Sequence, residues 1–181
     1  MTVQRIGTYK VMGFSFLELL ITVIILVIIT SIAFPAYTNF MNQKRVRTGT
    51  EELYNFIKIA QSEALTTKNT YYLSFSPTTW CYGLSDTAPC DCTVVNSCMV
   101  KSIQTIVRSG DYSGNPVALS ITGFSGTSSA PYIIFDGFHG TITSGGSITV
   151  SLSDKSARIN ANSMGLVTVC SNTVSGYQTC P

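Results

Sequence analysis

The sequence predicts an α+β protein in which one long N-terminal helix, kinked at Pro35, packs on an antiparallel β-sheet. Residues 14–34 are almost all apolar, and the residues that follow repeat apolar side chains at helical spacing. After Asn69 the apolar period changes to two, which is the period of strands. The chain has 181 residues, and its low charged fraction of 11% with a hydrophobic fraction of 45% excludes a disordered polyelectrolyte.

The apolar segment of residues 14–34 is long enough to cross a membrane. As a helix its 21 residues would span about 31 Å, close to the thickness of a bilayer core. A removable secretory signal has a shorter apolar run and a small-x-small cleavage site, and neither is found here. We therefore expect residues 14–35 to form a retained single-pass anchor. Its one ionisable residue, Glu18, is costly in lipid unless it is paired, and is therefore a candidate functional residue.

An amphipathic helix is expected over residues 36–67. Pro35 has no N–H to donate, so it should kink the helix rather than end it. One apolar stripe follows at spacings of three, four and seven: Val46, Leu53, Phe56, Ile57, Ala60 and Ala64.

The sheet region is expected over residues 70–181. Its strand candidates are 71–75, 80–84, 100–107, 117–121, 132–135, 147–152, 157–160 and 166–170. Segments 110–115 and 123–131, rich in Gly and Ser, are expected to be loops.

Six cysteines follow the anchor: Cys81, Cys90, Cys92, Cys98, Cys170 and Cys180. An even count beyond a membrane anchor favours disulfides in an oxidising compartment. Six cysteines can pair in 15 ways, and the sequence does not choose among them. The first four could instead hold zinc as four thiolates, but they lack the paired C-x-x-C spacing of such sites. The count of positive charges flanking the anchor does not favour an N-terminus on the inside, so the cysteines decide the orientation: the C-terminal side belongs in the oxidising space.

The N-terminus resembles the signal of type IV prepilins, in the glycine Gly13, the hydrophobic Phe14, and Glu18 five residues after the glycine. The resemblance implies the type IV pilin fold, with residues 1–13 as a leader that a prepilin peptidase removes between Gly13 and Phe14. It also implies N-methylation of Phe14. Glu18 would then pair with the new amine at Phe14 of a neighbouring subunit and so recruit it to a filament.

The rest of the chain resembles minor pilins and minor pseudopilins of the FimT/FimU/GspH type. The matching residues are Ala60, Ser62, Glu63 and Ala64, then Trp80, Gly83 and Leu84, then Cys90, Asp91 and Cys92. This implies a minor pilin that helps initiate assembly of a type IV pilus, at or near its tip. A minor pseudopilin of a type II secretion system is the alternative.

The same resemblance implies partners, location and one disulfide. The partners are other major and minor pilins, the prepilin peptidase and the inner membrane, with residues 36–181 as a periplasmic domain before the protein joins a pilus on the cell surface. Pilins commonly end in a disulfide loop, which implies that Cys170 pairs with Cys180. Cys81, Cys90, Cys92 and Cys98 then pair among themselves.

Catalysis and DNA binding are both disfavoured. His139 is the single histidine and lies in a Gly-rich turn, and no pair of carboxylates is placed for acid–base work, so we expect no catalytic residue, cofactor, metal or small-molecule substrate. Some relatives bind DNA for uptake through a G-R-x-R segment, which corresponds here to residues 165–168 and has neither arginine. From residue 36 on, nine basic and eight acidic residues leave a net charge of +1, too little for a typical duplex-binding surface.

Overall fold

A computed structural model describes residues 15–108 and 117–181. The expected cleavage site at Gly13 and Phe14, and the expected loop 110–115, lie outside these residues. The chain divides into two units, one ending at Phe40 and the other comprising Met41–Pro181, and each is described by itself.

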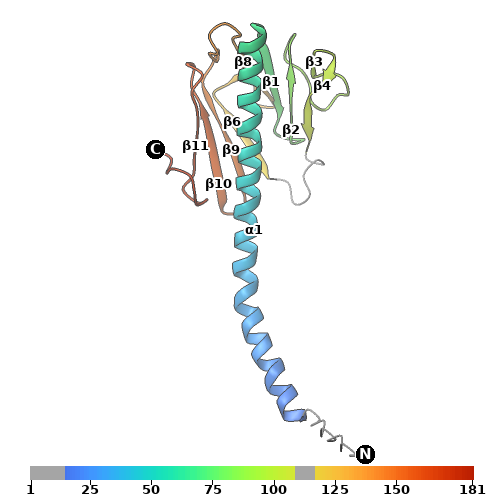
Figure 1. Ribbon diagram of the computed structural model, residues 1–181, viewed down its shortest axis with the longest axis vertical. Coiled ribbons are helices and arrows are strands. Elements are labelled where there is room, and N and C mark those ends of the chain that lie inside the picture. Colours follow the sequence, from blue (N-terminus) through green and yellow to red (C-terminus); the bar gives the residue numbers. More distant parts are fainter. Residues whose placement is uncertain (1–14, 109–116) are drawn as a thin grey trace, which may run out of the picture. The chain divides into compact units, whose positions relative to one another are not determined.

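One helix, α1 (Phe16–Thr67), accounts for all the helical structure described (Figure 1). It includes Pro35 without a break in its assignment, as expected for a proline that does not end the helix. The helix ends where the sequence predicts, and the next residue, Lys68, turns the chain with φ of 56°.

Eleven strands follow α1 and all pair antiparallel. Their bounds are β1 Tyr71–Ser76, β2 Cys81–Ser85, β3 Met99–Val100, β4 Ile103–Gln104, β5 Ile106–Arg108, β6 Ala118–Thr122, β7 Ser125–Thr127, β8 Ala130–Phe135, β9 Gly146–Leu152, β10 Lys155–Ala161 and β11 Val167–Cys170. A five-stranded sheet has the order β5-β2-β1-β8-β7, a four-stranded sheet has the order β11-β10-β9-β6, and β3 and β4 form a separate hairpin.

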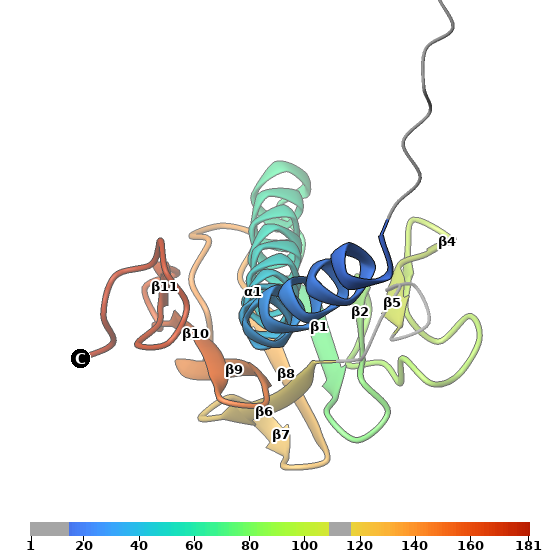
Figure 2. The same cartoon turned by 90° about the horizontal axis from the view of Figure 1, so that it is seen from below.

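The core of the second unit lies between α1 and the two sheets (Figure 2). Five of the six residues of the predicted apolar stripe are at most 1% exposed, and the sixth, Phe56, is partly buried against the same core. Alternate residues of the strands complete it from both sheets, among them Leu73, Ile133, Ile148 and Ile159. The helix therefore holds two separate sheets together, which confirms the predicted α+β packing.

Two expectations about the strands are wrong. Segment 123–131, expected to be a loop, contains β7 and the start of β8, because Gly126 adopts φ of 94° in a short hairpin of small residues that shows no apolar alternation. Segment 100–107, expected to be one strand, is divided among β3, β4 and β5. Lys101 and Ser102 form a two-residue turn at φ of 51° and 66°, a conformation that these residue types do not announce.

Candidate functional site

The first turns of α1 carry the predicted assembly residue, Glu18. The helix begins two residues before it, and the backbone N–H of Leu19 donates to the carbonyl of Ser15 at 3.2 Å. The large apolar side chains from Phe16 to Phe34 are all exposed, between 44% for Leu20 and 79% for Phe16. A surface of this kind is stable only when lipid or other protein covers it.

The few hydroxyl groups in this apolar stretch are satisfied within the helix. Thr22 Oγ1 donates to the carbonyl of Leu19 at 2.8 Å, Thr30 Oγ1 to that of Leu26 at 2.9 Å, and Ser31 Oγ to that of Ile28 at 2.8 Å. Such bonds remove the cost of placing a hydroxyl in an apolar medium. By length and composition α1 is the one helix in the described chain able to cross a membrane.

A loop closed by a disulfide ends the chain and docks on α1. Cys170 is bonded to Cys180, the pairing that the resemblance implied. The backbone N–H of Ser171 donates to the carbonyl of Gln178 at 2.8 Å, and Val174 at the centre of the loop is buried. Gln43 Nε2 on α1 donates to Ser175 Oγ at 2.5 Å.

Tyr177 makes a second contact between this loop and the helix. The Arg47 guanidinium lies 5.9 Å from the centre of its ring and pairs with Glu51 at 2.7 Å. The Tyr177 hydroxyl lies 3.5 Å from the Arg47 carbonyl and from Glu51 Oε1. Burial, together with the nearby Glu51 carboxylate, raises the pKa of Tyr177 to about 12.

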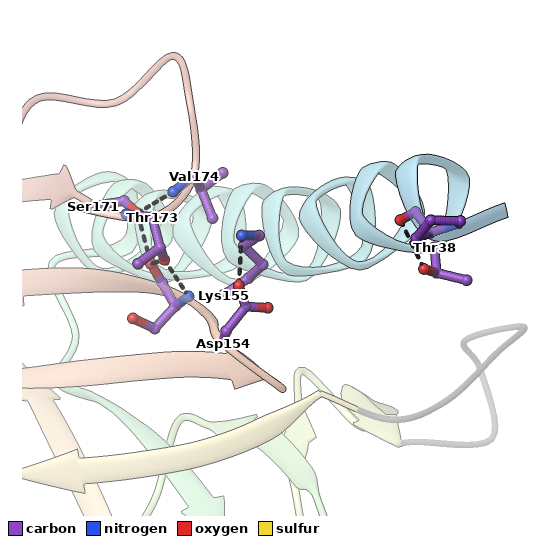
Figure 3. Close-up of polar contacts among 8 residues, drawn as sticks. Thr38, Asp154, Lys155, Ser171, Thr173 and Val174 are labelled. Carbon is purple, nitrogen blue, oxygen red and sulfur yellow. Dashed lines mark hydrogen bonds and ion pairs between the residues drawn. The ribbon is translucent and has the colours of Figure 1, made fainter. Parts of the chain in front are cut away.

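Hydroxyl groups anchor the same loop to β10 (Figure 3). Ser171 Oγ donates to the carbonyl of Ser156 at 2.6 Å and accepts the N–H of Val174 at 2.8 Å. Thr173 Oγ1 accepts the N–H of Ser156 at 2.7 Å. Figure 3 also shows the ion pair of Asp154 with Lys155 at 2.7 Å, and Thr38, whose hydroxyl donates to the Pro35 carbonyl at 2.9 Å. The sequence pattern predicted neither these bonds to β10 nor the contacts of Ser175 and Tyr177 with the helix.

The other four cysteines form two disulfides that fasten residues 86–98 over the five-stranded sheet. The pairs are Cys81–Cys92 and Cys90–Cys98, and their sulfurs pack together with Ile106. All six cysteines are therefore oxidised in pairs. The four that could have held zinc as thiolates form disulfides instead.

Gln61, which is half-buried beside the apolar stripe, joins two turns that the sequence pattern did not connect. Its Nε2 donates to the carbonyl of Gly140 at 2.8 Å and to that of Gly165 at 2.9 Å. Gly165 has φ of 83° and lies against Gly140, which in turn contacts Leu65. The end of α1 near Thr67 is thus bound to both turns.

The residues considered for catalysis and for DNA binding lie on neighbouring turns, since Gly165 lies against Gly140, the residue that follows His139. His139 Nδ1 is 2.7 Å from Asp136 Oδ2 on an exposed turn, and the N–H of Phe138 and His139 together lower the pKa of Asp136. Every cysteine is in a disulfide, so no thiol is available to this pair as a nucleophile. Residues 165–168 form a turn and the start of β11, and carry no cation.

Comparison with known proteins identifies the fold and the family. The sequence profile of the family described as type II transport protein GspH matches residues 49–165. A search among curated protein sequences finds no significant match.

Two solved structures share the fold. The minor pseudopilin EpsH from the type 2 secretion system of Vibrio cholerae has a TM-score of 0.51 at 8% identity, covering 70% of this chain and 97% of that one. The type IV minor pilin FimU of Pseudomonas aeruginosa PAO1 has a TM-score of 0.51 at 12% identity, covering 72% of this chain and 91% of that one. Both confirm the predicted pilin fold, in which one long N-terminal helix packs on antiparallel sheets. Since the family profile spans well over half of the residues, the chain belongs to the GspH family.

Proposed function

We propose that this protein is a minor pilin that helps initiate assembly of a type IV pilus and lies at or near its tip. The observation that carries the proposal is a helix whose apolar side chains from Phe16 to Phe34 are all exposed, with a single carboxylate, Glu18, near its start. The globular unit already has a complete core of its own. The exposed helix is therefore the surface on which other subunits would pack.

The proposed assembly step is the pairing of a carboxylate with an amine among apolar helices. Prepilin peptidase would cut between Gly13 and Phe14, and the new, methylated amine at Phe14 would be positively charged. A carboxylate buried among apolar helices is costly without a partner of opposite charge. Glu18 of one subunit would therefore bind the Phe14 amine of its neighbour and select the register in which the two helices pack.

The location follows from the anchor and the disulfides. The apolar helix would hold the protein in the inner membrane, and the three disulfides of Met41–Pro181 favour an oxidising compartment for that unit, which would be the periplasm. From there it would enter a filament with other major and minor pilins. The GspH family consists of structural components rather than enzymes, and we assign no small-molecule substrate.

A second candidate is a minor pseudopilin of a type II secretion system. The description of the matching family as a type II transport protein and the similarity to the pseudopilin EpsH favour it, whereas the similarity to FimU favours the pilus. A third, DNA capture at a pilus tip, has little support, since residues 165–168 carry no cation and Lys155 is paired with Asp154.

Crosslinking mass spectrometry on sheared, purified pili tests the proposal. We expect this chain, beginning at a methylated Phe14, to be crosslinked to other minor pilins and present in far fewer copies than the major subunit. A strain without prepilin peptidase is the control and should retain the uncut chain in membranes. Crosslinks only to pseudopilins would select the type II alternative, and a membrane-extracted chain that still begins at Met1 would overturn both.

A further inference from the structure

The face of the five-stranded sheet that points away from α1 carries an open groove of about 490 Å³. Leu73 and Ile133 of β1 and β8 point into the core, so the alternate residues Ser74 and Tyr132 point to the opposite face. One wall is the disulfide-bonded segment from Pro89 to Thr93, and the other is the β7–β8 hairpin.

The groove is rigidly built. The backbone N–H of Cys90 donates to Ser74 Oγ at 3.0 Å, which fastens the wall to the floor. The disulfides Cys81–Cys92 and Cys90–Cys98 hold the same wall at two further points. A site fixed in this way loses little conformational entropy when a ligand binds.

Tyr132 provides an aromatic surface in the groove. A Cβ atom at Gly126 would lie 2.9 Å from Cδ1 of the Tyr132 ring, so the ring rests directly on the backbone of β7. An aromatic ring on the neighbouring strand that packs over a glycine is a known way of stabilising an edge strand. The same Cβ atom would be 3.0 Å from Cε1, so the Cδ1–Cε1 edge of the ring meets Gly126, and both residues line the groove.

The described residues that line the groove with Tyr132 also supply polar groups. Asp91 Oδ1 accepts the N–H and the hydroxyl of Thr93, at 2.9 and 2.7 Å, and these bonds lower the pKa of Asp91. The other polar side chains that line the groove are hydroxyls, those of Ser74, Ser76, Thr93, Thr127, Ser129 and Tyr132. No Lys, Arg or His is among the described residues that line the groove, and the Arg108 guanidinium donates through Nε to the carbonyl of the lining residue Cys92 at 3.4 Å. A lining without a cation disfavours phosphate and other anionic ligands.

We propose that this groove binds a short neutral oligosaccharide, with one sugar ring stacked on Tyr132 and its hydroxyls bonded to Asp91 and the surrounding Ser and Thr side chains. Sugars combine apolar C–H faces with many hydroxyls that both donate and accept, and the groove offers the complementary ring, carboxylate and hydroxyls. An extended peptide fits less well, because β7 has only three residues with which to pair an added strand. The site would add a recognition function to the head of a filament subunit.

Saturation-transfer NMR and calorimetry on the full mature chain test this inference. The probes are chitotriose, cellotriose and maltotriose, each offered to protein in a detergent without a sugar headgroup. We expect at least one to bind with a Kd of about 1 mM, as suits an open groove. Tyr132→Ala should weaken that binding about tenfold or more, and Tyr132→Phe should retain it.

Matched variants separate the groove from the fold. Tyr72→Ala removes the same side chain from the same face of the sheet, outside the groove, and should leave binding unchanged. Asp91→Asn should weaken binding, whereas Asp154→Asn should not. If Tyr132→Ala does not fold, the comparison of Tyr132→Phe with Asp91→Asn decides. The inference is overturned if no probe binds, or if Tyr72→Ala weakens binding as much as Tyr132→Ala does. It is also overturned if Tyr132→Ala reduces only the crosslinking to another pilin, because the groove would then be a subunit interface.

Discussion

Gly83 on β2 lies directly beneath the sulfur of Cys98: a Cβ atom at position 83 would be 2.5 Å from Cys98 Sγ and 2.8 Å from Cys98 Cβ. Cys98 is fully buried and belongs to the disulfide with Cys90 that covers this strand. The glycine of the Trp80–Leu84 motif is therefore explained by packing, since it makes room for the disulfide over the sheet.

Gly83→Ala should lower the free energy of unfolding by about 1–3 kcal/mol, because the added methyl group has no space in a packed, crosslinked region. Urea unfolding followed by near-UV circular dichroism measures the change. Gly49→Ala is the matched control: its Cβ would lie 3.3 Å from a Val117 methyl group, and better helix propensity offsets that contact, so its effect should be smaller. Equal unfolding midpoints for Gly83→Ala and the wild type would show that the close approach of Cys98 does not exclude a larger side chain at position 83.

The C-terminal loop should depend on its disulfide for stability. Replacing Cys170 and Cys180 by Ser opens a loop of sequence separation 10, which costs about 3 kcal/mol in the loop-entropy model. The loop should also become sensitive to proteases, which limited proteolysis with mass spectrometry would detect. Tyr177→Ala keeps the disulfide but removes the contact with Arg47, and should cause a smaller loss. If that variant were as unstable as the double Ser variant, docking on the helix rather than the crosslink would hold the loop.

The sequence predicted the fold wherever one physical pattern dominated. The stripe from Val46 to Ala64 repeats at helical spacing because those side chains are buried, so its position and its end at Thr67 could be predicted. The hairpins at Lys101–Ser102 and around Gly126 could not, because backbone turns determine them and their residues alternate too little.

In the candidate site, too, some residues could be predicted from the sequence and others could not. Glu18 is visible in the sequence because a lone acid in an apolar segment is unusual. The contacts of Gln61 with Gly140 and Gly165, and of Tyr177 with Arg47, join residues 79, 104 and 130 positions apart. Polar residues on a surface give no periodic signal, so such long-range pairs emerge only from the folded chain.

Alkaline pH should weaken the docking of the C-terminal loop through Tyr177. Its pKa rises from 10.0 to about 12 in the folded protein, so folding favours the neutral phenol. The resulting stability is fully present below pH 10 and is lost as the pH rises from 10 towards 12. Between pH 8 and pH 11, the urea midpoint of the wild type should therefore fall further than that of Tyr177→Phe, because phenylalanine cannot ionise. No free cysteine is present to exchange disulfides at high pH, and equal falls for the two proteins would assign the alkaline loss to other groups.

Glu18→Leu should leave membrane insertion intact and impair incorporation into filaments. Leucine removes a charge from an apolar helix, so insertion becomes easier, while the neighbouring amine at Phe14 loses the carboxylate that we propose as its partner. Membrane fractions and sheared filaments, probed with an antibody to the globular unit, measure both properties. Thr22→Val, one turn further along the helix, is the control, because the Thr22 hydroxyl bonds only within its own helix at 2.8 Å and should not be needed for assembly. Normal incorporation of Glu18→Leu would remove Glu18 from the mechanism, and equal loss in both variants would point to general damage to the helix instead.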